Sequence, residues 1–207
     1  MNKMKRVKRV FSNTAFLALA LSASCVGQPG HLAIYSPIEA GLVLQYEGME
    51  LDTGQLSQNR LQLWVRQTKQ TPEGLEVECA ASTYQGTASV VSLCQHDGSV
   101  FLMAPSGGRI MVLPSGFPYK IAAWQSDGIN YRVVGRAKAD ISCVTHPDNV
   151  GIWVEAQPIP PQSSILGFEK VRYLFLPGIG ESQTMAFLDG KWITVNKLTG
   201  KSHANAL

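Results

Sequence analysis

The sequence has 207 residues, of which 45% are hydrophobic and 16% are charged, enough for one domain with a buried core. Its 18 Lys and Arg residues against 15 Asp and Glu residues give a formal net charge of +3. Five of these cations and none of the acids precede Cys25, so from Cys25 onward the net charge is −2. This balance excludes the clustered basic face expected of a nucleic-acid-binding protein.

Residues 1–24 have the order of features that is typical of a secretory signal peptide. The cations of this segment are Lys3, Lys5, Arg6, Lys8 and Arg9. The apolar run 16–21 follows, and then the small residues 22–24. The apolar run is well short of the ~20 residues that a membrane-spanning helix needs. A short buried helix is the alternative, but five cations in nine residues do not suit a core, so we predict an exported protein.

Cys25 ends the segment LSASC, which resembles the lipobox of bacterial lipoproteins, where cleavage exposes a cysteine for acylation. The lipobox prefers an aliphatic residue three positions before the cysteine, whereas this chain has Ser22 there and Leu21 one place earlier. Cleavage after Ala23 or Ser24, without acylation, is the alternative. Residues 25–34 are predicted to be a tether to a membrane surface. The expected location is the outer membrane or periplasm as a lipoprotein, with a soluble periplasmic or secreted protein as the alternative.

Residues 35–200 are predicted to form one antiparallel β domain, and residues 201–207 a flexible tail. Residues 60–69 show the clearest strand pattern, because Leu61, Leu63 and Val65 alternate with polar residues and Trp64. Other strands are expected at 42–47, 75–83, 88–95, 99–104, 109–113, 129–138 and 150–157, followed by three within 168–197.

The middle of the chain, residues 105–146, is less regular. Residues 119–125 fit either a strand or one helical turn, because periodicity cannot decide over so short a run. In total we predict about ten strands and no long helix after the signal-peptide helix. The fold class is therefore all-β, as a single curved antiparallel meander or half-barrel.

Three tryptophans lie opposite the aliphatic rows of their predicted strands: Trp64, Trp153 and Trp192. A curved sheet with isolated indoles on one face can form a groove that binds an apolar ligand. The alternative is that these side chains cover ordinary structure beneath loops, because scattered aromatic residues are common on sheets.

The cysteines allow a disulfide, which an exported protein can form. If Gly86 and Thr87 make a two-residue turn, Cys79 falls opposite Cys94, and Cys143 remains unpaired. If Cys25 is not acylated, four cysteines allow three pairings of two bridges.

No catalytic residue, metal site or cofactor is predicted. The pairs Cys94 with His96 and Cys143 with His146 match no standard zinc spacing. There is no Gly-x-Ser-x-Gly motif, and Gly200-Lys201-Ser202 lacks the glycine that a phosphate-binding loop requires before it. A hydrolase of the cell envelope is therefore the hypothesis with the least support, behind the two binding functions given below.

The segments YLFLPGIG at 173–180 and ESQTMAFLDG at 181–190 resemble the ends of uncharacterised bacterial exported and lipoprotein β half-barrel families. These families are broadly similar to the periplasmic lipoprotein carrier (LolA/LolB-like) fold. The carriers hold helices inside the half-barrel, whereas this sequence shows no amphipathic helix. The resemblance implies a half-barrel at the envelope and does not imply an activity.

These observations favour a non-enzymatic cell-envelope protein whose curved sheet binds an apolar ligand or a lipoprotein segment. Its partners would be the membrane, through the acylated N-terminus, and that ligand. The second hypothesis is a structural or interaction module that binds an envelope protein through its sheet surface or an edge strand.

Overall fold

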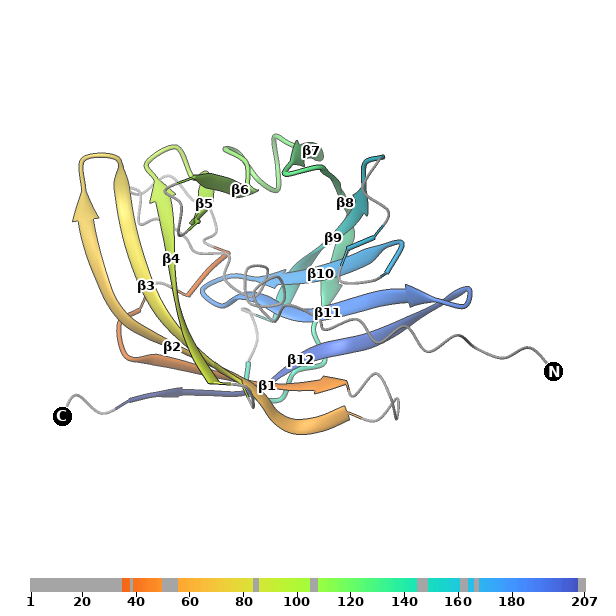
Figure 1. Ribbon diagram of the computed structural model, residues 1–207, viewed down its shortest axis with the longest axis horizontal. Coiled ribbons are helices and arrows are strands. Elements are labelled where there is room, and N and C mark those ends of the chain that lie inside the picture. The colour runs from red at the N-terminus through yellow and green to blue at the C-terminus, as the bar shows by residue number, and fades with distance from the viewer. Residues whose placement is uncertain are drawn as a thin grey trace.

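The computed structural model describes residues 35–37, 39–49, 56–83, 86–104, 108–144, 149–160, 164–165 and 168–204. Twelve strands form one antiparallel sheet in the order β6-β5-β4-β3-β2-β1-β12-β11-β10-β9-β8-β7 (Figure 1). The strands are β1 (Leu42–Met49), β2 (Leu56–Thr71), β3 (Gly74–Thr83), β4 (Gly86–Gln95), β5 (Val100–Met103), β6 (Arg109–Leu113), β7 (Ala123–Ser126), β8 (Ile129–Lys138), β9 (Val150–Pro158), β10 (Val171–Leu176), β11 (Gly180–Leu188) and β12 (Lys191–His203).

All neighbouring strands of the sheet are consecutive in the chain, with the exception of β1 and β12, which pair in the middle. The sheet curls into a nearly closed barrel, so that its end strands β6 and β7 approach each other (Figure 1). Residues 114–122 join these two strands. Both end strands are short, which limits the edge open to another chain.

The period-two pattern of the sequence separates an inner from an outer face. In β2, Leu63 and Val65 are fully buried on the inner face, while Trp64 between them is 43% exposed on the outer face. In β9, Ile152 and Val154 face inward in the same way. The inner faces of the strands together form one hydrophobic core.

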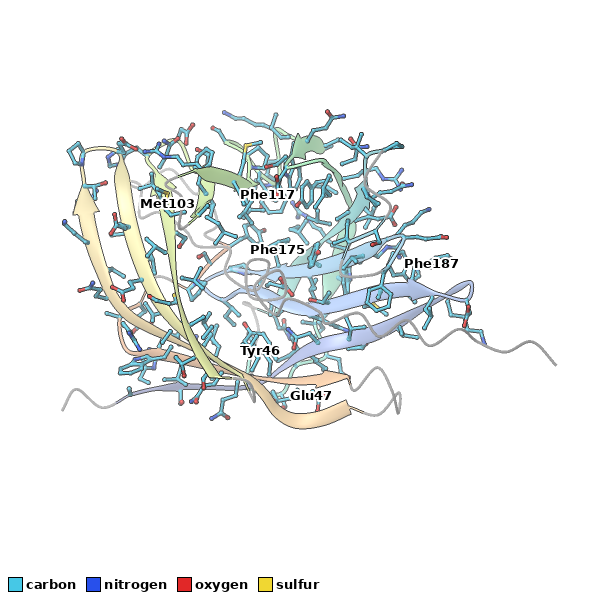
Figure 2. The ribbon with its side chains drawn as sticks, viewed as in Figure 1. Tyr46, Glu47, Met103, Phe117, Phe175 and Phe187 are labelled. Carbon is cyan, nitrogen blue, oxygen red and sulfur yellow. The ribbon has the colours of Figure 1, made fainter. Side chains whose placement is uncertain are left out.

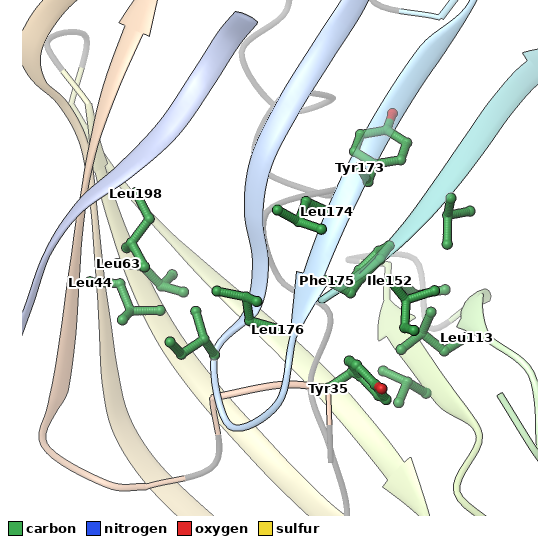
Figure 3. Packing of buried hydrophobic residues seen from close by; sticks show 14 of the residues in the cluster. Tyr35, Leu44, Leu63, Leu113, Ile152, Tyr173, Leu174, Phe175, Leu176 and Leu198 are labelled. Carbon is green, nitrogen blue, oxygen red and sulfur yellow. The ribbon is translucent and has the colours of Figure 1, made fainter. Parts of the chain in front are cut away.

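Strand β10 is buried on both of its faces, except at Arg172. Tyr173 and Phe175 lie on one face, and Leu174 and Leu176 lie on the other (Figure 3). Gly151 of β9 allows a close approach here, since a Cβ atom at this position would lie 2.7 Å from the Leu174 side chain. The β10–β11 hairpin is therefore held inside the molecule.

A register shift in this hairpin decides which side chains of β11 face inward. Phe175 pairs with Glu181 and Leu174 pairs with Gln183, so Ser182 is the extra residue of a β-bulge. The Ser182 hydroxyl donates to the Leu174 carbonyl over 2.9 Å. Because of the bulge, Glu181 and Thr184 lie close enough to hydrogen-bond to each other.

The all-β antiparallel prediction is confirmed, with twelve strands in place of about ten. Residues 119–125 divide between the loop and β7, and β12 continues to His203, beyond the expected domain end at residue 200. The described residues include no helix. The predicted signal peptide at 1–24, the tether at 25–34 and Cys25 lie outside the described residues.

Candidate functional site

Polar side chains from four strands meet on the inner face of the sheet, where apolar residues are the rule. They are Tyr46 of β1, Tyr173 of β10, Glu181 and Thr184 of β11, and Asn196 of β12. None of the five is more than 3% exposed. Thr184 pairs with both Tyr173 and Asn196 across its neighbouring strands, which places these side chains in adjacent rows. We call this set the polar cluster.

The hydrogen bonds of the polar cluster are incomplete. The Thr184 hydroxyl donates to Oε1 of Glu181, and the Tyr46 hydroxyl donates to the Glu181 backbone carbonyl over 2.9 Å. Oε2 of Glu181 and the hydroxyl of Tyr173 are buried without a partner among the described residues. Buried polar atoms normally have partners, so each exception requires an explanation.

The surroundings keep Glu181 uncharged. No Lys or Arg of the described residues forms an ion pair with it, and burial raises its pKa to about 8, against the smaller opposing effect of the Thr184 hydrogen bond. Burial, followed by the nearby Glu181, also raises the pKa of Tyr46 and of Tyr173 well above the ordinary value. The polar cluster is therefore neutral near pH 7.

Six aromatic rings extend from the polar cluster along the inner face. Tyr173 lies 6.3 Å from Phe175, Phe175 lies 6.0 Å from Phe117, and Phe117 lies 5.8 Å from Trp124, as distances between ring centroids. Tyr131 stacks on Trp124 at 5.1 Å. The sixth ring is Tyr35, which meets Phe117 edge-on at 5.3 Å. We call these rings the aromatic array.

The aromatic array draws its rings from distant parts of the chain. Phe117 comes from the loop that joins β6 to β7, and Figure 2 shows it with Tyr46 and Phe175 between the walls of the sheet. Nε1 of Trp124 is buried without a partner among the described residues. The inner face therefore combines extended apolar surface with three polar atoms that have no partner among the described residues.

The outer face shows a different arrangement, centred on Glu155 of β9. Its carboxylate accepts from Arg132 of β8 over 3.1 Å and from Arg172 of β10 over 2.8 Å and 3.0 Å. The Arg172 guanidinium lies 4.1 Å from the ring centroid of Trp192, which in turn contacts Phe187 at 5.3 Å. We call this set the outer network.

The structure places Trp64, Trp153 and Trp192 on three separate strands and does not bring them together. Trp64 is largely exposed on the outer face with the Arg66 guanidinium 5.9 Å from its ring. Trp153 stands between Ile152 and Val154, which face inward, so it belongs to the other face of β9. Trp192 belongs to the outer network. The alternation of residue types in the sequence separated the two faces of each strand correctly. The indole on the concave face, however, is that of Trp124.

The register expected for Cys79 and Cys94 is wrong. Thr83 pairs with Gly86, which places Cys79 opposite Val90 and Cys94 opposite Leu75. The two cysteines are thereby offset by four positions, or about 13 Å along the strand, which is too far for a disulfide. Burial raises the pKa of the Cys79 thiol to about 12, which makes it unreactive.

Within the part of the chain that the structure describes, no three His, Cys, Asp or Glu side chains gather as metal ligands. No helix in the same residues is long and apolar enough to cross a bilayer. The polar cluster was missed at the sequence level. The available signal was Glu181, the one acidic residue between Val171 and Leu188, placed directly after the turn of this hairpin.

No protein-family model matches the sequence, and no curated protein matches it either. A candidate exported protein from Bacteroides fragilis with a YmcC-like fold has a TM-score of 0.50 at 14% identity, covering 83% of this chain and 100% of its own. A candidate lipoprotein from Parabacteroides distasonis has a TM-score of 0.48 at 13% identity, covering 84% of this chain and 100% of its own.

At these sequence identities the similarity concerns the fold alone. It rests on the Bacteroides fragilis structure, whose TM-score is 0.50. Neither neighbour is a lipoprotein carrier by name, so the LolA/LolB-like part of the resemblance stays a prediction.

Proposed function

We propose that this is a non-enzymatic cell-envelope protein, anchored through an acylated Cys25, whose curved sheet holds an apolar or amphipathic ligand against its inner face. The charged start and apolar run of residues 1–24 support export. The names of the two structural neighbours, a candidate lipoprotein and a candidate exported protein, are in line with it. The ligand is a lipid-like molecule or the acylated end of another lipoprotein.

The observation that carries the proposal is the composition of the aromatic array. A core that served only for packing would be expected to use Phe and Leu, because these side chains leave no polar atom without a partner. Trp124 and Tyr173 instead bury a ring nitrogen and a hydroxyl that have no partner among the described residues. Groups of this kind, converging with apolar rings, are typical of sites that bind small molecules.

The non-enzymatic part of the proposal rests on the protonation of the buried groups. Tyr46, Tyr173 and Cys79 all have pKa values raised by burial, so they are poor nucleophiles and poor bases near pH 7. Glu181 lies there as a neutral acid, suited to hydrogen bonding.

The test is extraction of the protein with its native leader from an envelope fraction, followed by native mass spectrometry. We expect a mass added to the chain that organic solvent removes, and an acylated Cys25 at the mature N-terminus. The variant Trp124→Leu should lower the occupancy severalfold. Trp64→Leu is the matched control, because Trp64 is 43% exposed on the outer face. A folded wild-type chain that is empty in this experiment would overturn the proposal.

A second candidate function uses the outer face as a docking surface for an envelope protein. It is favoured by Trp64, a large apolar side chain that remains 43% exposed. Photo-crosslinking from position 64 in cells, with position 150 as an exposed control on β9, would test it. A specific adduct from position 64 alone would support this role.

A further inference from the structure

We infer that Glu181 binds the polar end of the ligand as a neutral hydrogen-bond donor, so that the ligand is an uncharged amphiphile with an ester, amide or ketone oxygen. This inference rests on the proposed function, which assigns a ligand to the inner face. It goes further by naming the residue that selects the ligand and the chemical group that the residue selects.

The hydrogen bonds around Glu181 leave one of its two carboxyl oxygens available to a ligand. Oε1 already accepts from the Thr184 hydroxyl, and the Tyr46 hydroxyl is occupied by the backbone carbonyl of Glu181. A protonated carboxyl group has one O–H donor, and here the oxygen without a partner among the described residues is Oε2. The proton on Oε2 therefore needs an acceptor, which a carbonyl oxygen supplies.

Tyr173 adds a second buried polar atom on the same face of the sheet. Its buried hydroxyl likewise has no partner among the described residues, and it is near enough to Glu181 for the carboxyl to affect its pKa. A carbonyl oxygen has two lone pairs and accepts two hydrogen bonds. One ligand oxygen can thus satisfy both Glu181 and Tyr173.

The groups that face the polar cluster argue against a charged ligand. Tyr46 comes from β1, Cys79 from β3, Cys143 from the segment after β8, Tyr173 from β10 and Asn196 from β12. All are uncharged near pH 7, so no described side chain there neutralises a carboxylate ligand. A cationic ligand would have to ionise Glu181 at a site where burial opposes the charge.

The aromatic array fixes the direction of the ligand. Starting from Tyr173 at the polar cluster, the rings lead through Phe175 to Phe117 and Trp124. The polar end of an amphiphile therefore belongs at Glu181, and its apolar part belongs along these rings.

The experiment compares monolaurin, laurate and dodecylamine, which share one chain length and present a neutral ester, an anion and a cation. Binding is measured by native mass spectrometry and by fluorescence of Trp124 in a chain that carries Trp64→Phe, Trp153→Phe and Trp192→Phe. The variants are Glu181→Gln, which keeps a donor of similar shape, and Glu181→Leu, which removes it. Circular dichroism of each variant shows that it is folded.

We expect wild-type protein to prefer monolaurin to both charged probes. Glu181→Leu should weaken monolaurin binding roughly tenfold, the value of one buried hydrogen bond, and Glu181→Gln should change it by less than about threefold. Between about pH 6 and pH 10, wild-type binding should fall as Glu181 ionises, whereas Glu181→Gln should show no fall over the lower part of this range.

The possible failures are distinguishable. If no probe binds to the folded wild-type chain, the proposed function fails, and the inference fails with it. If monolaurin binds equally to wild type and Glu181→Leu, the inner face binds ligands but Glu181 does not select them. A preference for dodecylamine that Glu181→Gln abolishes would overturn the neutral-donor role in favour of an ionised carboxylate.

Discussion

Two buried carboxyl groups lie two strands apart in the sheet, and their surroundings differ in charge. Glu155 on the outer face is 8% exposed, and Glu181 on the inner face is 2% exposed. Glu155 lies between two arginines, whereas the hydrogen-bond partner of the Glu181 carboxyl is a neutral threonine hydroxyl. The outer carboxyl is paired with two arginines, whereas burial favours the neutral acid form of the inner one.

The largest expected difference is in the pH dependence of stability. Burial raises the pKa of Glu181 from an ordinary 4.5 to about 8 in the folded protein. The folded chain therefore holds a proton that the unfolded chain releases between these two pH values. Stability from this group is fully present below about pH 4.5, declines through the window, and is lost above about pH 8.

The size of this loss is on the order of 5 kcal/mol, from the cost of ionising the buried group. Urea unfolding of wild type and Glu181→Gln at several pH values between about 4 and 9 measures it, because the difference between the two curves removes the other titrating groups. Parallel curves would mean that Glu181 is already ionised in the folded protein.

The next effect concerns the outer network. Glu155→Ala should lower the free energy of unfolding by about 2 kcal/mol, because two arginines lose their carboxylate; a larger cost is not expected, since Arg132 is 67% exposed. Glu73→Ala is the control, because its ion pair with Arg109 spans 2.6 Å between two exposed side chains. We expect it to cost about 0.5 kcal/mol or less. Equal costs in the two variants would contradict the view that Glu155 is a buried, paired charge.

The smallest effect is that of a single hydroxyl. Tyr173→Phe removes a buried polar atom that has no partner in the described residues, so the free energy of unfolding should stay unchanged or rise by up to about 1 kcal/mol. Thermal unfolding measures the change, and Tyr46→Phe is the comparison. Tyr46 donates to a buried carbonyl, so its variant should instead be less stable by about 1 kcal/mol. A clear loss of stability in Tyr173→Phe would show that its hydroxyl is partnered within the protein.

The sequence predicts the strands well because their pattern is local. The alternation in residues 60–69 indicates both the strand and its buried side, and Leu61, Leu63 and Val65 are indeed buried. Pairing register depends on turn geometry. One hairpin closes at Thr83 and Gly86 in place of the expected turn, and this shift alone removes the predicted contact between Cys79 and Cys94.

The candidate site is hidden from the sequence for two reasons. A bulge at Ser182 leaves no mark in the residue pattern, yet it brings Thr184 within hydrogen-bonding reach of Glu181. Trp124, the indole that lies inside, belongs to the middle segment where no regular period exists, while Trp64 faces outward. Alternation separates two faces, and only the three-dimensional curl decides which of them is concave.

The pairing of β1 with β12 constrains the order in which the chain can fold. Leu42 lies opposite His203, so the centre of the sheet joins the two ends of the described chain. Before β12 pairs with them, β1 and β11 are both open edge strands. They are eight and nine residues long. Contacts between residues far apart in the sequence form slowly, because the long loop between them must close first. A chain that emerges N-terminus first therefore leaves the edge of β1 open to other chains until β12 has emerged.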